Sequence, residues 1–369
     1  MNNFNRFHLV FLLAVIFTSQ ACSQLNDSNE ILIGNKGTPG NEIIEPEPDP
    51  ITQPRIPVIP GPIEMGEVGL IPALSDTEIT VMFQREYANP IVIANSPSYF
   101  GADTALVRIT NVYSDRMTIR LVEAPDRDGV HTFENLSYLV IEEGSWMTYP
   151  GNHRIEAGRV NSDANYLGTL GEVEANFNDR WEAISFANDF GETPAVWAQV
   201  QSASNQISEA ECLANRMECS KIYYLQNRQR NESSMGFEVA MQQERTEANP
   251  HPTESIGWIA MNIAMGEWSG LSFETRVTEP LVDHMFRQIS FLMSFIAPPR
   301  LITGMQGLAG GNPAHLRQRN LTTSSFELMV EEDQGDLDPS DPNTFLHAME
   351  SISYFAIGGT GILTATPID

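Results

Sequence analysis

The sequence is poor in basic residues. Its 369 residues include 21 Lys and Arg against 48 Asp and Glu, which gives a formal net charge of −27. Nucleic acids bind proteins largely through Lys and Arg that neutralise phosphates, and anionic lipid surfaces attract the same side chains. The composition therefore argues against a nucleic-acid partner. It also argues against electrostatic docking of the folded part onto a membrane.

Recognisable catalytic motifs are absent as well. The chain contains no G-x-S-x-G, no H-E-x-x-H, no Walker A sequence and no dinucleotide-binding fingerprint. These patterns supply an activated nucleophile, a metal site or a phosphate cradle. We therefore expect a protein that is not an enzyme.

Residues 8–17 form an apolar run that is about half as long as a membrane-spanning helix needs. Arg6 precedes the run, and Ala21-Cys22 follows it. This arrangement resembles a bacterial lipobox, although Ser19 stands where Leu is usual. It predicts a signal peptide over residues 1–21 and lipidation of Cys22. The alternative is an ordinary secretory signal that is cleaved near Ala21.

Under the lipobox interpretation, Ser23 favours a bacterial outer membrane lipoprotein that faces the periplasm or the cell surface. The membrane would then be contacted through the N-terminal lipid only. Residues 22–65 are rich in Pro and acidic residues and cannot bury a core. Such a segment is typical of an extended spacer, so we predict a stalk there.

The two remaining cysteines are Cys212 and Cys219, in a polar stretch. Export places them in an oxidising compartment, where a disulfide closing a small loop is the natural interpretation. The alternative is a metal pair, for which no further ligands occur nearby. We expect the disulfide, on an insertion that forms a surface loop.

One sequence unit recurs three times. Strand-like runs that end in Phe83, Phe186 and Phe291 lie about a hundred residues apart, and each is followed by Pro and an apolar strand. The second half of the unit repeats more clearly as H-x-x-E-[NS]-[LI]-[SG]-[YW]-[LIF]-[VA]-[IM]. The internal period predicts three repeats, at residues 66–165, 166–275 and 276–369.

Alternation of apolar residues predicts that the three H-x-x-E segments are strands. In the first copy, Glu134, Leu136, Tyr138 and Val140 fall on one face. No window of a dozen residues after the stalk shows convincing helical periodicity. We therefore expect an all-β protein made of three tandem antiparallel β-sandwiches, each long enough for its own core.

These features resemble the H-type lectin domain, known from snail agglutinins and discoidins. The resemblance lies in their order: Phe, Pro with an apolar strand, an Arg-containing strand, a Phe strand and a [SG]-[YW] strand. The Arg strand reads LVRITN at 106–111 and HLRQRN at 315–320. In the second copy we align IYYLQN at 222–227, with Tyr224 in place of Arg.

The resemblance implies six-stranded sandwiches that bind N-acetylgalactosamine-type sugars at the seams of a threefold trimer. Three copies in one chain would then close into an intramolecular pseudo-trimer, and the alternative is beads on a string. The aromatic-His pair of the animal lectins is missing at 124–125, 244–245 and 333–334. Trp146, Trp197 and Trp268 are candidates to replace its stacking surface.

Three His–Glu pairs stand out: His131 with Glu134, His251 with Glu254, and His347 with Glu350. A Glu that caps loop N–H groups and pairs with His is the structural interpretation. Ligand contact, a metal site and acid–base chemistry are the functional ones. Polar residues at one aligned position, Glu123 and Glu332 with Gln243 between them, serve either a ligand or a loop.

We take as candidate ligand contacts the polar residues that these patterns share. They are Arg108, Glu123, His131, Glu134, His251, Glu254, Arg317, Glu332, His347 and Glu350. Acidic stretches at 126–129 and 333–341 raise calcium as a possible cofactor, although neither has EF-hand spacing. Otherwise we expect no cofactor and no metal.

The expected function is non-catalytic binding of a glycan or another surface polysaccharide, in adhesion or capture. Repeated weak sites on one chain would add avidity. The alternative is a structural spacer or protein-interaction module without a sugar site. Binding predicts at least two copies with an exposed Trp or Tyr beside Arg or Glu. A spacer predicts that Tyr138, Trp258 and Tyr354 are buried.

Overall fold

The computed structural model describes residues 61–125, 127–166, 180–204, 207–243, 251–332 and 346–368. The predicted signal peptide, the lipidation site Cys22 and nearly all of the predicted stalk lie outside these residues. Strands dominate the described part, which confirms the all-β expectation. Below, the first, second and third repeats are residues 66–165, 166–275 and 276–369, and their boundaries stay predictions.

Each repeat contains one three-stranded antiparallel sheet, and the strand order is the same in all three. The orders are β2-β5-β4, β9-β12-β11 and β16-β19-β18. The strands are β2 (Ile79–Met82), β4 (Ala105–Val112), β5 (Arg116–Glu123), β9 (Glu182–Ser185), β11 (Leu225–Ser233), β12 (Gly236–Gln243), β16 (Arg287–Ser290), β18 (Ala314–Arg319) and β19 (Ser325–Glu332).

A second sheet layer is built on the H-x-x-E segments, which form strands as predicted. These are β6 (Glu134–Glu142), β13 (Glu254–Met261) and β20 (Ser351–Ile357). Each pairs on one side with the apolar strand after Pro, namely β3 (Pro90–Ile93), β10 (Ala195–Val200) and β17 (Arg300–Gln306). Each pairs on the other side with β1 (Ile63–Leu74), β8 (Arg154–Ser162) and β15 (Leu271–Val277).

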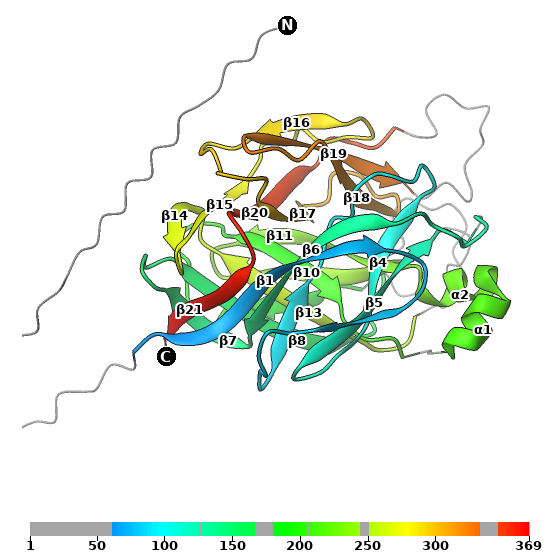
Figure 1. Ribbon diagram of the computed structural model, residues 1–369, viewed down its shortest axis with the longest axis horizontal. Coiled ribbons are helices and arrows are strands. Elements are labelled where there is room, and N and C mark those ends of the chain that lie inside the picture. Colours follow the sequence, from blue (N-terminus) through cyan, green and yellow to red (C-terminus); the bar gives the residue numbers. More distant parts are fainter. Residues whose placement is uncertain are drawn as a thin grey trace, which may run out of the picture. The chain divides into compact units, whose positions relative to one another are not determined.

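Antiparallel pairs link the repeats in sequence. Hairpins join β7 (Gly144–Thr148) to β8 and β14 (Ala264–Trp268) to β15. The last strand, β21 (Gly361–Pro367), makes the corresponding pair with the first strand, β1. Figure 1 shows β21 in red beside β1 in blue, with β7 on the other side of β21. The two ends of the folded region therefore meet as neighbouring strands.

One buried hydrophobic cluster lies within each repeat, a fourth is shared by all three, and a fifth lies under the second-repeat insertion. The first-repeat cluster joins Met117 and Ile119 of β5 to Tyr138 and Val140 of β6, across the two sheet layers. Corresponding clusters fill the second and third repeats. The shared cluster contains Ile91, Trp197 and Ile302, one residue from each repeat. Burial of apolar surface therefore stabilises both the individual repeats and their association.

The second-repeat insertion is helical, and it is not simply a surface loop. It forms α1 (Glu209–Ala214) and α2 (Arg216–Tyr223), which lie beside β5 of the first repeat. A capping box between Ser208 and Glu211 begins α1. The predicted disulfide between Cys212 and Cys219 is confirmed, with 4.8 Å between the Cα atoms.

Both cysteines are buried, and they belong to a cluster that includes Leu106 and Val122 of the first repeat. Arg120 of β5 adds an ion pair of 2.8 Å to Glu209. The insertion therefore clamps the second repeat onto the first. A surface loop was expected here, whereas the insertion forms two short helices whose apolar partners come from another repeat.

Candidate functional site

Buried ion pairs join the repeats in a cyclic order. Arg108 of the first repeat lies 3.2 Å from Glu254 of the second. Arg228 of the second repeat lies 2.7 Å from Glu350 of the third, and Arg317 of the third lies 2.8 Å from Glu134 of the first. The side chains of all six residues are almost fully excluded from solvent.

The alignment that placed Tyr224 at the Arg position of the second repeat was wrong. The Arg of that repeat is Arg228, three residues into β11. The stretch LQNRQRN at 225–231 ends in the same RQRN as the third-repeat strand, where Arg317 stands. The shared RQRN sequence could have identified Arg228 as the equivalent of Arg317. The alignment failed because the insertion lies directly before β11.

The Glu of each H-x-x-E segment caps the loop that follows the apolar strand of its own repeat. Glu134 accepts hydrogen bonds from the backbone N–H groups of Phe100 and Gly101 at 2.9 Å. Glu254 accepts from Ser204 N–H, and Glu350 from Ala309 and Gly310 N–H. Each Glu thus satisfies buried loop donors and the Arg of the preceding repeat with one carboxylate.

The His of each segment lies in the loop before the strand, so it can approach the Glu three residues later. In the first repeat, His131 Nε2 is 3.2 Å from Glu134 and Nδ1 is 3.0 Å from Glu123. In the third, His347 is held in the same way, 3.0 Å from Glu350 and 2.6 Å from Glu332. Glu123 also accepts a hydrogen bond from the N–H of Gly129.

The protonation of these histidines follows from their partners. Burial acts to lower the pKa of His131, but the hydrogen bonds that its ring donates to Glu123 and Glu134 outweigh it and raise the pKa above its ordinary value. The same balance raises the pKa of His347. The raised pKa favours the charged ring, so His and Arg together face the buried carboxylates at each of these seams, which limits the cost of burying charge.

The second repeat differs at one position and balances its charge in another way. Gln243 replaces the second carboxylate, and His251 lies 3.7 Å from Glu254. Burial lowers the pKa of His251, so the neutral ring is favoured. One Arg then faces one Glu at this seam.

The ten candidate ligand contacts all lie buried. None is more than 5% exposed. Their contacts hold loops and repeats together, and a ligand-contacting role for them stays a prediction. The three tryptophans proposed as stacking platforms, Trp146, Trp197 and Trp268, are at most 6% exposed and belong to the shared core. They offer no exposed ring to a sugar.

A second set of buried glutamates was missed by the sequence analysis. Glu67, Glu156 and Glu274 lie on β1, β8 and β15. Glu67 accepts hydrogen bonds from the hydroxyls of Tyr138 and Tyr87, and Glu274 accepts one from Tyr354. The available signal was one acidic residue within each of three apolar strands. These groups explain how the repeated Tyr is satisfied inside the core.

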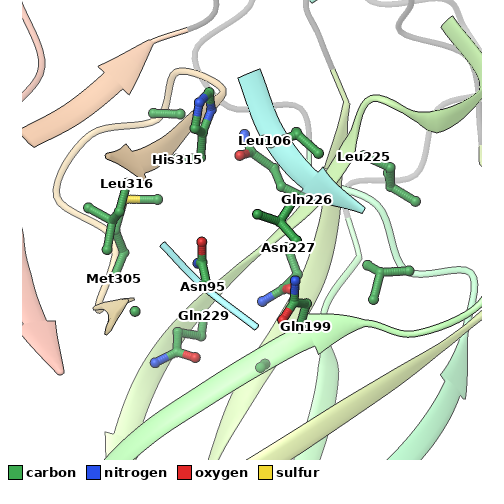
Figure 2. A pocket seen from close by; sticks show the side chains of 15 residues that line it. Asn95, Leu106, Gln199, Leu225, Gln226, Asn227, Gln229, Met305, His315 and Leu316 are labelled. Atoms are coloured by element: carbon green, nitrogen blue, oxygen red, sulfur yellow. The ribbon is translucent and has the colours of Figure 1, made fainter. Parts of the chain in front are cut away.

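A small cavity lies where strands of the three repeats converge. Its volume is about 60 Å³, enough for a few water molecules. Figure 2 shows its polar side chains, among them Asn95 from the first repeat, Gln199 from the second and His315 from the third.

A larger groove of about 500 Å³ lies between the first and third repeats. Its aromatic wall is Tyr99 and Phe100, from the loop after β3, and the ring of Phe100 is 67% exposed. Its third-repeat wall includes Arg300 at the start of β17 and Arg319 at the end of β18. This open groove combines an exposed ring with hydrogen-bonding side chains.

Cations and aromatic rings alternate along the aromatic wall. The Arg317 guanidinium lies 4.9 Å from the centre of the Tyr99 ring, which packs edge-on against Phe286 at 5.1 Å. Arg319 lies 3.8 Å from the centre of the Phe286 ring. These alternating cations and rings hold Tyr99 in place at the seam.

Within the described residues, no group of three or more His, Cys, Asp and Glu has the arrangement to hold a metal ion. The calcium prediction falls largely on Asp126 and residues 333–341, which lie outside the described residues. In the described part, no helix is both long and apolar enough to span a membrane.

No family model matches the chain, and no solved structure matches it. Halomucin from Haloquadratum walsbyi is 25% identical over 318 residues, which make up 83% of this chain. The chain spans only 3% of the length of that relative. A likeness of this extent shows neither a family nor an activity.

Proposed function

We propose that the folded part of this protein binds a saccharide of a glycan or surface polymer without catalysis, in the groove between the first and third repeats. The observation that carries the proposal is the exposed ring of Phe100 beside polar side chains in an open groove of about 500 Å³. The size lies in the usual range of small-ligand sites.

The chemistry of such a groove suits a sugar. One face of a pyranose ring is apolar and packs on an aromatic ring, while its hydroxyl groups need hydrogen-bond partners at the edges. Phe100 supplies the ring, and Asn135, Asn320 and Arg300 line the same groove. We propose binding alone, because no nucleophile and base are paired among these lining residues.

We further propose that the three repeats are H-type-lectin-like sandwiches that close into a pseudo-trimer. The cyclic Arg–Glu pairs support this arrangement, since each repeat offers an Arg to the next and a Glu to the one before. The pairing of β21 with β1 supports it too, because it repeats the pairing of β7 with β8 and of β14 with β15.

The groove belongs to one seam. Ser204 and Ala309 take the place of Phe100 in the loops that Glu254 and Glu350 cap. We therefore propose one saccharide site per chain at this position, and multivalency would come from several anchored chains. Binding was expected to show an exposed Trp or Tyr in at least two copies, and at this loop position that expectation is not met, because Ser204 and Ala309 carry no ring.

For the cellular context, we propose an exported bacterial lipoprotein that carries its lipid on Cys22, in the outer membrane. The lipobox-like sequence and the Pro-rich residues 22–65 support this arrangement. An acidic stalk would hold the binding groove away from the membrane surface.

A glycan array tests saccharide binding with residues 61–369. We expect binding that Phe100→Ala reduces at least tenfold. Phe133→Ala is the matched control, because Phe133 is 61% exposed in the same repeat and does not line the groove. Binding that survives Phe100→Ala would keep the function and reject this groove.

One observation favours the structural-spacer alternative. Tyr138, Trp258 and Tyr354 are at most 7% exposed, as that alternative predicts. An array without any signal, obtained with protein that unfolds cooperatively, would therefore move the conclusion to a spacer or a protein-interaction module.

A further inference from the structure

The groove differs in charge from the protein that surrounds it. The whole chain has 48 acidic residues and a net charge of −27. The residues that line the groove, all within the described part of the chain, include Arg300 and Arg319 and no Asp or Glu. The electrostatic potential at a site depends most on the nearest charges. Arginines in a groove without acidic lining residues therefore attract an anion there, although the protein as a whole is acidic.

The two arginines are not equally available. Arg319 is paired with Glu327 at 2.5 Å. Arg300 donates through Nε to Thr360 Oγ1 at 2.9 Å, and its guanidinium forms no ion pair among the described residues. Its terminal nitrogens are therefore free for a ligand, and a planar guanidinium matches a carboxylate or sulfate in two parallel hydrogen bonds.

Burial provides a second reason for an anion. Partial burial lowers the pKa of Arg300, because the charged form loses part of its hydration. An anionic ligand at this position would compensate that loss.

The two features that a ligand can reach lie on opposite walls of the groove. Arg300 belongs to the third-repeat wall and Phe100, 67% exposed, to the first-repeat wall. The groove thus combines a cation and an exposed aromatic ring.

We propose that the ligand of this groove is an acidic saccharide. Its carboxylate or sulfate lies against Arg300 and its ring against Phe100. This inference rests on the proposed saccharide-binding function and adds the chemical class of the sugar.

The test is an array on which each sugar backbone is present in a neutral, a uronate and a sulfated form, probed with residues 61–369. We expect at least tenfold stronger binding to an acidic form than to its neutral counterpart. The preference should weaken as salt is raised, because the contact is partly ionic. The uronate and sulfate arms show which anion is bound.

Arg300→Gln should remove the preference for the acidic form. Arg116→Gln is the matched control, since Arg116 is a partly exposed arginine of the first repeat that pairs with Asp115 outside the groove. Thermal unfolding of both variants shows whether the fold is intact.

Each outcome has one meaning. Equal binding of neutral and acidic forms, or a preference that survives Arg300→Gln, overturns the acidic-saccharide inference and leaves saccharide binding in place. Silence on every form from folded protein overturns both proposals.

Discussion

The guanidinium of Arg317, in the third repeat, donates a 2.8 Å hydrogen bond to the carboxylate of Glu134, in the first. The same guanidinium donates to the carbonyls of Ser98 and Gly101, in the loop that Glu134 caps. One buried pair therefore fixes both the contact between distant repeats and the conformation of the loop that carries the groove's aromatic wall.

We predict that Arg317→Met destabilises the fold by about 3–5 kcal/mol, because it leaves buried Glu134 and Glu331 without the arginine that pairs with both. Urea unfolding followed by far-UV circular dichroism measures the change. The aromatic loop should also lose order, so saccharide binding should fall with stability.

The double variant Arg317→Met, Glu134→Gln should recover part of the loss, because the unpaired charge is removed as well. A loss below about 1 kcal/mol for the single variant would show that the pair is not a major stabilising contact.

The second prediction concerns pH. The folded pKa of His131 and His347 is raised above 6.5. The stabilising contribution of these histidines to the free energy of unfolding is therefore complete below about pH 6.5, and it is lost as pH rises through the folded pKa. The pKa of Glu134 and Glu350 is lowered, against burial, chiefly by hydrogen bonds from His131 and His347. The stabilising contribution of these glutamates is present above about pH 4.5, and it is lost as pH falls through the folded pKa.

The melting temperature should therefore be highest between these limits and should decline on the alkaline side. Calorimetry from pH 5 to 9 measures the profile. The variant His131→Gln, His347→Gln should show a smaller alkaline decline. His251→Gln should leave the alkaline decline unchanged, because burial lowers the pKa of His251. An alkaline decline of equal size in all three proteins would contradict this account.

The third prediction concerns the disulfide. The double variant Cys212→Ser, Cys219→Ser should lose about 2–3 kcal/mol, the loop-entropy value for so short a loop. The effect should be local, because the bridge lies within α1 and α2 and these helices pack on β5. Hydrogen exchange should show lost protection in the helices and β5, with the third repeat unchanged. A uniform loss across all repeats would place the role of the bridge elsewhere.

The fourth prediction concerns the anchor. When the full chain is expressed with its own signal in a bacterium, Cys22→Ser should abolish labelling by a palmitate analogue and release the protein from the membrane fraction. Ser23→Ala is the control, since it keeps the lipid attachment site. Membrane association without Cys22 would favour a different anchor.

Several features could be predicted from the sequence because they depend on local patterns. Alternation in the segments after His131, His251 and His347 predicts strands, since side chains of a strand alternate between its two faces. The spacing of Cys212 and Cys219 predicts the small disulfide loop. The recurrence of the same unit predicts three cores, which the structure contains.

Only the tertiary structure decided how those units meet. The partner of Arg108 is Glu254 and the partner of Arg317 is Glu134, and nothing local in the sequence indicates pairs so far apart along the chain. The groove also joins side chains from two repeats, such as Phe100 and Arg300, which is why the sequence analysis missed it. Local patterns determine strands because the backbone period is local. Seams and sites depend on which buried faces and charges satisfy one another, and that is settled only when the repeats associate.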